Sequence, residues 1–377
     1  MNTTLQTLMR DATRLTRAGQ LNEAVAAIQR ALGNHAAGAT STPPQAMTRS
    51  FDLLTEAPPV RPPPASHRAP ASAPPRGDFT TGTHTQASRT LRYKLYVPPG
   101  HADRPLPLVV MLHGCTQNPD DFAAGTAMNE LACEQGFIVL YPAQSQDANP
   151  QRCWNWFKHN HQQRGSGEPA VIAGMTQAVI KAHAIDPRRV YIAGLSAGGA
   201  MAAIVAAAYP DMFAAAGVHS GLPGGSASDV AGALAVMSSG EPGLAMGAKA
   251  GVPYAPASSR MAVPTIVFHG DQDHTVHPRN GEKVIAAALA GHSAAAQVEQ
   301  GRAGGGRSFT RRVHRDAAGR NVAEHWVVHG AGHAWSGGRA EGSYTDASGP
   351  DATREMLRFF LERPHTGLDS SASSDSL

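Results

Sequence analysis

The residues with the clearest chemical capability lie in the segment 194–198, which reads Gly-Leu-Ser-Ala-Gly. It stands between an apolar stretch at 189–193 and an Ala-rich stretch of helical character at 197–208. A serine on the sharp turn between a strand and a helix projects from the C-terminal edge of a sheet, where it can attack an acyl group. The pattern therefore predicts Ser196 as a nucleophile, with an ordinary Gly-rich loop as the alternative interpretation.

A serine hydroxyl needs a base within hydrogen-bond distance and a third group that orients the base. The orienting acid is expected in the segment 269–276, which follows the apolar stretch 265–268. With the acid in this segment, the order along the chain is serine, acid and then histidine, which is the order in one known class of catalytic triads. Asp273 is the preferred acid. Asp271 directly follows Gly270, and we expect it to stabilise the turn.

The base is expected in the loop that follows the apolar stretch 325–328. His333 is the preferred residue because its loop is short, late in the chain and contains two glycines. His325 lies inside the predicted strand and His329 ends it, so both are expected to have structural roles. The chain has 18 histidines, so position rather than residue type has to identify the base.

An acyl-transfer reaction also needs hydrogen-bond donors for the tetrahedral oxyanion. One donor is the backbone N–H of the residue after the nucleophile, Ala197. The second is expected in the loop 113–117, His-Gly-Cys-Thr-Gln, which follows the apolar stretch 106–112. The backbone N–H of Cys115 is the natural candidate there. Its side chain is expected to be a small buried thiol or one half of a disulfide.

All these candidates follow predicted strands, so the fold must bring the ends of the strands to one edge of a sheet. Strands are predicted at 90–97, 106–112, 136–141, 189–193, 213–218, 265–268 and 325–328, and helices at 120–134, 169–184, 197–208 and 351–362. This alternation predicts an α/β domain with a mostly parallel sheet and helices on both faces. The weakly periodic segment 221–262 is expected to be an insertion over one end of the sheet, with a lid as one interpretation.

Composition divides the 377 residues into four parts. Residues 1–34 predict a helical hairpin, which either packs on the main domain or serves as a docking or self-association handle. Residues 35–88 are rich in Pro and Ala and predict a disordered linker, with docking into an aromatic groove as an alternative role. The α/β domain is expected at 89–364 and a disordered tail at 365–377.

Composition also excludes several functions. The formal net charge is only +3, without a long basic block, so nucleic-acid binding is not expected. The sequence has no apolar run of about 18 residues that would predict a membrane span. Three cysteines are too few for a disulfide framework. No metal or cofactor is expected, because the His-Asn-His sequence at 159–161 has no further ligands at suitable spacing and no phosphate-binding glycine pattern follows the first strand.

Several ordered motifs together resemble the polyhydroxybutyrate (PHB) depolymerase-like esterases, α/β-hydrolases that are related to feruloyl and acetylxylan esterases. They are LHGCTQ at 112–117, CWNWF at 153–157, GLSAGGAM at 194–201, HGDQDHTV at 269–276, GHAWSGG at 332–338 and GPDAT at 349–353. The resemblance covers about residues 89–364. It implies an α/β-hydrolase fold and a serine esterase that hydrolyses a poly(3-hydroxybutyrate)-type polyester, its oligomers or a small ester.

By this resemblance, the five residues selected above form the catalytic triad and the oxyanion hole. The resemblance also implies a disulfide between Cys115 and Cys153 that fixes the oxyanion loop. Trp154 and Trp156 resemble aromatic residues that line the substrate cleft, with burial in the core as the alternative interpretation. Gln117 is likewise expected to contact substrate.

Two other functions remain as alternatives to polyester hydrolysis. One is a feruloyl- or acetyl-carbohydrate esterase with the same triad. The other is a non-catalytic scaffold on a polymer granule, in which residues 1–34 and the linker mediate association. No secretory signal is recognised, which favours a cytoplasmic location. Many members of the family are secreted, so an extracellular location is the alternative.

Overall fold

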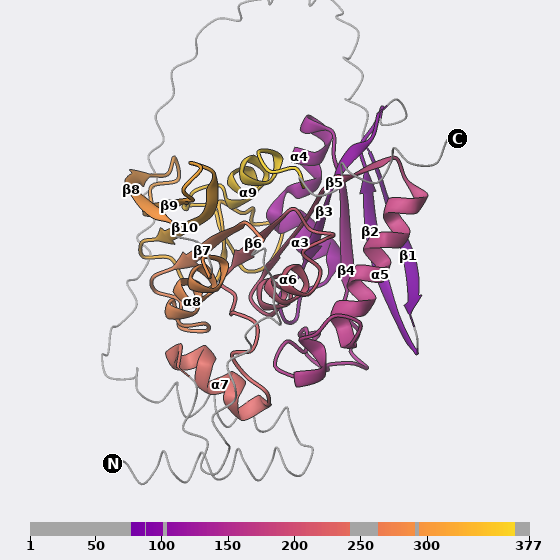
Figure 1. Cartoon of the computed structure of the whole chain (residues 1–377), viewed down its shortest axis with the longest axis horizontal. Helices are drawn as coiled ribbons and strands as arrows, with labels where there is room; N and C mark the ends of the chain where they lie inside the picture. Colours follow the sequence, from indigo (N-terminus) through magenta and orange to yellow (C-terminus); the bar gives the residue numbers. More distant parts are fainter. Residues whose placement is uncertain (1–76, 87, 101–103, 242–262, 291–293, 366–377) are drawn as a thin grey trace, which may run out of the picture. The chain divides into compact units, whose positions relative to one another are not determined.

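The computed structural model describes residues 77–86, 88–100, 104–241, 263–290 and 294–365. They form an α/β domain around one large sheet (Figure 1). The predicted hairpin at 1–34, residues 35–76 of the predicted linker and the predicted tail from residue 366 lie outside the described residues. Within the described part of the chain, no helix has the length and apolar character needed to cross a membrane.

In the described residues the sheet has ten strands, in the order β1-β2-β4-β3-β5-β6-β7-β10-β9-β8. They are β1 (Asp78–Gln86), β2 (Arg89–Val97), β3 (Leu106–Leu112), β4 (Ile138–Ala143), β5 (Ile185–Leu195), β6 (Ala215–His219), β7 (Thr265–Gly270), β8 (Ala295–Arg302), β9 (Ser308–Arg315) and β10 (Asn321–Val328). The central strands β4, β3, β5, β6, β7 and β10 run parallel, and the outer strands pair antiparallel. The prediction of a mostly parallel sheet is therefore confirmed.

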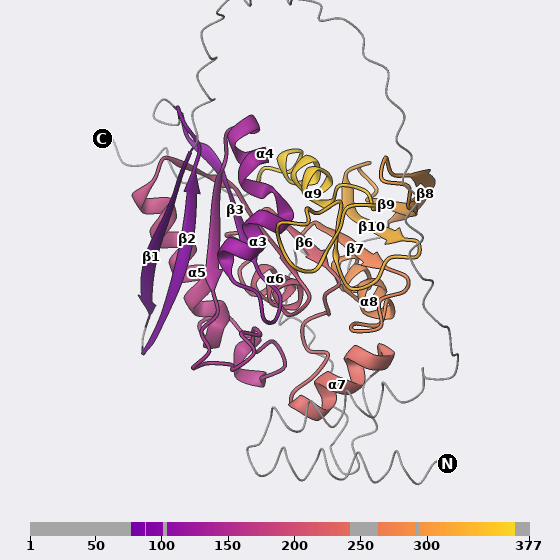
Figure 2. The same cartoon turned by 180° about the vertical axis from the view of Figure 1, so that it is seen from behind.

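Helices cover both faces of the sheet, which Figures 1 and 2 show from opposite sides. The helices are α3 (Pro119–Thr126), α4 (Met128–Gln135), α5 (Gly167–Ala182), α6 (Ala197–Ala208), α7 (Val230–Ser239), α8 (Arg279–Ala288) and α9 (Ala352–Leu361). Side chains of β3 alternate between the two faces: Leu108 and Val110 pack with residues of α5 and α6, whereas Val109 and Met111 pack with residues of α3, α4 and α9. All of β3 is buried, as expected for a strand that is covered on both sides.

The stretch 120–134 does not form the single helix that its sequence predicts. Ala127 separates α3 from α4 and has a left-handed backbone conformation with φ +53°. The carbonyl oxygen of Thr126 accepts a hydrogen bond from the hydroxyl of Thr353 on α9, at 2.7 Å. The local sequence favours one helix over 120–134, but the chain breaks it at Ala127, next to this contact with α9.

Strand β1 corrects the predicted boundary between the linker and the domain. Residues Asp78–Gln86 pair antiparallel with β2 along their whole length. Because β1 lies at the edge of the sheet and carries mainly Thr and other polar side chains, it lacks the apolar alternation that predicts a strand. The folded domain therefore includes β1 and starts before residue 89.

Besides β1, further elements are absent from the sequence prediction, among them β8, β9, α7 and α8. The hairpin of β8 and β9 closes the other edge of the sheet, and the side chains of β8 are largely exposed. Helix α7 lies inside the predicted insertion 221–262, of which residues 242–262 are outside the described ones. Strand β8 has little apolar pattern to predict it because its side chains are exposed along nearly its whole length.

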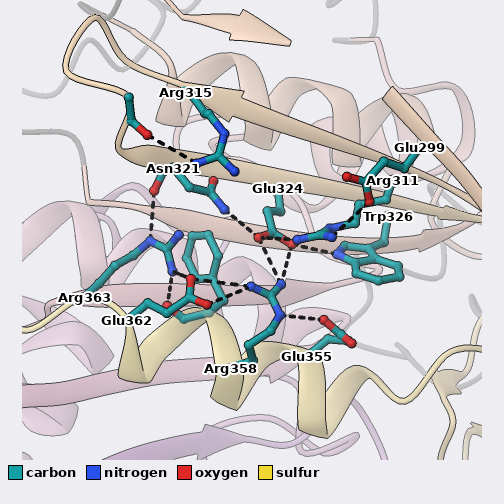
Figure 3. A network of polar contacts seen from close by, with 12 residues as sticks. Glu299, Arg311, Arg315, Asn321, Glu324, Trp326, Glu355, Arg358, Glu362 and Arg363 are labelled. Carbon is teal, nitrogen blue, oxygen red and sulfur yellow. Dashed lines mark hydrogen bonds and ion pairs between the residues drawn. The ribbon is translucent and has the colours of Figure 1, made fainter. Parts of the chain in front are cut away.

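Glu324 on β10 joins three elements of the domain (Figure 3). Its buried carboxylate accepts hydrogen bonds from Arg311 on β9 at 3.1 Å and from Arg358 on α9 at 2.7 Å. The indole N–H of Trp326 and the amide of Asn321 also donate to it. A carboxylate is stable in the interior only when it is paired and hydrogen-bonded. This network therefore helps to hold α9 against the sheet.

Candidate active site

Ser196 occupies the turn between β5 and α6 with a backbone φ of +57°, a value that is uncommon outside glycine. Its N–H donates to the carbonyl oxygen of His219 at 2.9 Å. The turn also needs small neighbours, because a Cβ atom on Gly198 would lie 2.1 Å from the carbonyl oxygen of Leu112. The segment therefore forms a tight, strained strand–helix turn with the serine at its apex.

Asp273 and His333 form a hydrogen-bonded pair, with 2.7 Å between Asp273 Oδ2 and His333 Nδ1. The second carboxylate oxygen accepts the N–H groups of Thr275 at 2.9 Å and Val276 at 2.8 Å. Burial alone would raise the pKa of Asp273, but hydrogen bonds with His269 and His333 hold that pKa well below its usual range. Asp273 is thus an anion that orients the imidazole of His333 through its Nδ1.

The loops that carry this acid and this histidine are packed directly on each other. The N–H of Gln272 donates to the carbonyl oxygen of Ala331 at 3.0 Å. A Cβ atom on Gly270 would lie 2.3 Å from that same oxygen, so only glycine fits there. The two loops therefore form one unit at the ends of β7 and β10.

A second carboxylate–imidazole pair lies in the same two loops. His329 Nδ1 is 2.9 Å from Asp271 Oδ2, and the other oxygen of Asp271 accepts the N–H of Gly330 at 2.7 Å. His329 also contacts the hydroxyl of Thr310 at 2.9 Å through Nε2. Both ring nitrogens of His329 are therefore engaged, in line with the structural roles expected for Asp271 and His329.

His219 connects the serine turn to the histidine loop. Its carbonyl oxygen accepts the Ser196 N–H, and its ring Nε2 accepts the N–H of Ser336 at 2.9 Å. The ring stacks between Trp335 and Phe268. Burial lowers the pKa of His219 to about 3, so the ring is neutral and can accept this hydrogen bond.

The loop 113–117 lies beside Ser196. A Cβ atom on Gly114 would be 3.7 Å from the Cβ atom of Ser196, which places this loop against the serine. His113 fixes the start of the loop: its Nδ1 donates to the Gly114 carbonyl at 2.8 Å, and its Nε2 accepts the N–H of Gln144 at 3.1 Å. Burial lowers the pKa of His113 to about 4, which keeps the ring neutral.

Cys115 and Cys153 are joined by a disulfide. The carbonyl oxygen of Cys153 accepts a hydrogen bond from the side chain of Gln144, whose amide group also donates to Glu168 at 2.7 Å. The buried Glu168 carboxylate additionally accepts the backbone N–H of Asn155 at 2.7 Å. The segment that carries Cys153 is thus held from several sides, and the disulfide transmits this constraint to Cys115.

Three expected substrate contacts take another role in the structure. Trp154 is wholly buried and donates its indole N–H to the carbonyl oxygen of His113 at 3.1 Å, and Trp156 is 4% exposed in the same apolar core. Gln117 is 2% exposed, and its side chain accepts the Gly114 N–H and donates to Asp121. The alternative interpretation of buried tryptophans therefore holds, because both offer little surface to a substrate, and Trp154 and Gln117 hold the loop 113–117 through hydrogen bonds.

No cluster of His, Cys, Asp and Glu that could hold a metal ion occurs among the described residues. Of the His-Asn-His sequence at 159–161, His161 is buried with its Nδ1 3.4 Å from Glu168. Glu168 and Gln144 also support the site, and no motif in the sequence predicts this role. Their signal is weak, since a single Glu near a helix start and a single Gln after a strand occur in most proteins.

Comparison with known proteins adds independent evidence. A family model described as esterase PHB depolymerase matches residues 91–310. Poly(3-hydroxyalkanoate) depolymerase C of Paucimonas lemoignei is 34% identical over 234 residues, which cover 60% of this chain and 54% of that protein. Probable acetylxylan esterase A of Aspergillus fumigatus is 34% identical over 215 residues, which cover 53% of this chain and 54% of that protein. The chain thus spans about half the length of these curated relatives.

A solved structure shares the fold. The acetyl xylan esterase from Aspergillus awamori superposes with a TM-score of 0.57 at 21% sequence identity, and the match covers 75% of this chain and 99% of that one. The ten-stranded sheet with helices on both faces is accordingly an α/β-hydrolase fold, as the motifs predict.

Proposed function

The chain belongs to the PHB depolymerase family of esterases, and from this we propose that it is a serine ester hydrolase with Ser196, His333 and Asp273 as its triad. The observation that carries the proposal is the buried pair of Asp273 and His333, joined at 2.7 Å, in a domain that also holds Ser196 on a strained strand–helix turn. The proposed acid, base and nucleophile each follow a central parallel strand, and the C-terminal ends of such strands lie at one edge of the sheet.

In the first half-reaction, His333 Nε2 takes the proton of the Ser196 hydroxyl while the serine oxygen attacks the ester carbonyl carbon. Asp273 stabilises the imidazolium cation that forms. The tetrahedral intermediate collapses when His333 gives the proton to the departing alcohol oxygen, which leaves the acyl group on Ser196. In the second half-reaction, His333 activates a water molecule that releases the acid.

The N–H groups of Ala197 and Cys115 are the proposed donors to the oxyanion. Ala197 is the first residue of α6, so its N–H has no acceptor within the helix, and the helix N-terminus favours negative charge. Cys115 follows Gly114, which lies against Ser196, and its position is fixed by the disulfide. Donors held in place before the reaction stabilise the transition state without reorganisation.

The proposed substrate is a poly(3-hydroxybutyrate)-type polyester or its soluble oligomers. The family and the relative from Paucimonas lemoignei support it. The test compares wild type and Ser196→Ala on a short p-nitrophenyl ester, a 3-hydroxybutyrate trimer and amorphous polymer. We expect the wild type to cleave all three, and Ser196→Ala to lose about ten-thousandfold or more in rate. A variant with wild-type activity would contradict the triad.

The second candidate is a carbohydrate esterase, because an acetylxylan esterase relative matches at the same 34% identity. Acetylated xylan and feruloyl sugar esters included in the same assay distinguish the two candidates. Preference for these sugar esters over the hydroxybutyrate trimer would keep the triad and move the proposed substrate to carbohydrates.

Residues 1–34 are proposed to mediate association with a polymer granule or with a second copy of the chain. Because the folded domain includes β1, the truncation that tests this must end at residue 76 rather than at 88. We expect the truncated protein to hydrolyse soluble esters at the wild-type rate and to sediment less with granules. Unchanged sedimentation and unchanged oligomeric state would contradict this role.

A further inference from the structure

Tyr344 contacts both halves of the candidate active site. Its ring lies 6.4 Å from the ring of His333, centroid to centroid, in an edge-on arrangement with an angle of 78° between the planes. Its hydroxyl oxygen is 3.2 Å from the hydroxyl oxygen of Thr116, in the loop that contains Cys115. One side chain thus reaches from the proposed base to the proposed oxyanion loop.

The direction of these hydrogen bonds follows from the number of protons. The Thr116 hydroxyl donates its single proton to the carbonyl oxygen of Cys115, at 2.6 Å. It can therefore only accept from Tyr344, whose own hydroxyl donates to it. The phenol ring is held at its far end by this bond, which fixes its orientation without burying it.

Tyr344 is also fixed through its backbone. Its carbonyl oxygen accepts the N–H of Trp335, two residues after His333, at 2.7 Å. The preceding residue, Ser343, is held by Asp121, whose carboxylate accepts the Ser343 N–H at 2.8 Å and the Ser343 hydroxyl at 2.6 Å. The position of Tyr344 relative to His333 is thus set by the parallel pairing of two short strands that follow these residues, β11 (Trp335–Ser336) and β12 (Thr345–Asp346).

Two features set Tyr344 apart from a structural tyrosine. It is 46% exposed although its ring lies against the ring of His333, the proposed base. Tyr344 and Thr116 also both have positive φ, at +53° and +65°. Such strained residues occur preferentially at active sites and ligand clamps, where the surrounding structure maintains them.

Resting on the proposed function, we propose that Tyr344 forms the wall of a subsite for the alcohol part of the ester. His333 must give its proton to the oxygen of the leaving alcohol, so this part of the substrate lies beside His333 in the transition state. The exposed ring of Tyr344 borders that position. A ring held rigidly at an exposed site gains apolar contact when it covers a ligand, with little loss of side-chain entropy.

The alcohol that fits is larger than a simple alkanol and has an apolar face. The 3-hydroxyacyl unit of a polyester meets this description, with its methyl and methylene groups for the ring of Tyr344. Methanol or ethanol as the leaving alcohol is too small to cover the ring. The subsite therefore distinguishes esters by their alcohol and is indifferent to the acyl chain.

Two matched pairs of substrates test the subsite in the full-length protein. The first pair varies only the alcohol: ethyl 3-hydroxybutyrate against the inner ester bond of the methyl ester of the 3-hydroxybutyrate dimer, whose cleavage is followed by the release of methyl 3-hydroxybutyrate. The second pair varies only the acyl group: p-nitrophenyl acetate against p-nitrophenyl butyrate. We expect Tyr344→Ala to reduce the kcat/KM preference for the dimer over the ethyl ester about tenfold. The ratio within the second pair is expected to stay within about twofold of wild type.

Tyr344→Phe keeps the ring and loses the hydroxyl, and we expect it to retain most of the preference for the dimer. If Tyr344→Ala does not fold, Tyr344→Leu replaces it and is expected to show a smaller loss in the same direction. Val298→Ala on β8 is the matched control, because it truncates an exposed apolar side chain on a strand at the edge of the sheet.

An equal loss on both substrates of the first pair, or a change confined to the second pair, would overturn the subsite and leave the proposed function intact. Hydrolysis that persists in Ser196→Ala would overturn the proposed function and this inference with it. The two failures are thus read from different variants.

Discussion

Asp271 Oδ2 lies 2.9 Å from His329 Nδ1, so a second carboxylate–imidazole pair stands beside the pair of Asp273 and His333. The two pairs differ in their surroundings. The side chain of Asp273 is fully buried, whereas those of Asp271 and His329 are 33% and 40% exposed. Both ring nitrogens of His329 have partners, which favours His333 over His329 as the proposed base.

This difference predicts unequal effects of two matched substitutions. Asp273→Asn is expected to lower kcat about ten-thousandfold, since it removes the group that orients the proposed base and stabilises its cation. Asp271→Asn changes only hydrogen bonds to His329 and Gly330 in the histidine loop, and we expect kcat to fall about tenfold or less. Ester hydrolysis by both purified variants, with circular dichroism to compare folding, is the measurement. Equal losses, or a larger loss for Asp271→Asn, would contradict the assignment of Asp273 as the acid of the triad.

The disulfide predicts a joint effect on stability and rate. Cys153→Ser opens a loop with a sequence separation of 38, which is expected to cost about 4 kcal/mol of unfolding free energy. Freedom in the loop of Cys115 should also lower kcat, by up to about a hundredfold, because an oxyanion donor is displaced. Urea unfolding and initial rates measure the two effects.

Cys133→Ser is the matched control for this test, because Cys133 takes no part in the disulfide. Treatment of wild type with dithiothreitol is expected to reproduce the loss of rate, and treatment of Cys153→Ser to add nothing. Full activity after verified reduction would show that the disulfide does not hold the oxyanion donor.

Substitution of Glu324 is expected to lower the free energy of unfolding and to leave catalysis unchanged. Glu324→Gln leaves Arg311 and Arg358 without their buried partner and is expected to cost about 3–5 kcal/mol. Burial would raise the pKa of Glu324, but the two arginines hold that pKa below its ordinary 4.5. The stabilisation is therefore present above pH 4.5 and is lost as the pH falls through the lowered value. Urea unfolding of wild type and variant at pH 7 and at pH 4 should show the gap narrowing, with unchanged kcat at pH 7.

The buried His219 is expected to make the free energy of unfolding sensitive to acid. His219 has a pKa of about 3 in the folded chain, against 6.5 for an ordinary histidine. The unfolded chain therefore binds a proton below pH 6.5 that the folded chain does not bind. This removes about 1.4 kcal/mol of stability per pH unit as the pH falls toward the folded value.

His219→Gln removes the group that binds this proton in the unfolded chain. The variant is expected to be less stable than wild type at pH 7, but to lose about 2 kcal/mol less than wild type between pH 7 and pH 5. Urea unfolding at the two pH values measures the difference. Parallel losses in both proteins would contradict a neutral, buried His219.

Residue types and spacing were enough to select Ser196, Asp273 and His333. The reason is that each one follows a long apolar strand of a parallel sheet, and the C-terminal ends of such strands meet at one edge. The same regularity predicted the central strands from 106 to 328 in their order along the chain. Edge elements such as β1 and β8 escaped because their exposed faces remove the apolar pattern.

Contacts between distant segments were decided only by the tertiary structure. The sequence around Trp154 and Gln117 is compatible with exposure or burial, and packing behind the loop 113–117 placed both inside. Tyr344 was likewise not predicted as a site residue. No motif around it indicates such a role, and only the fold brings it to Thr116, 228 residues away. Local pattern determines strands and turns, whereas the identity of a residue's neighbour from a distant segment depends on how the whole domain packs.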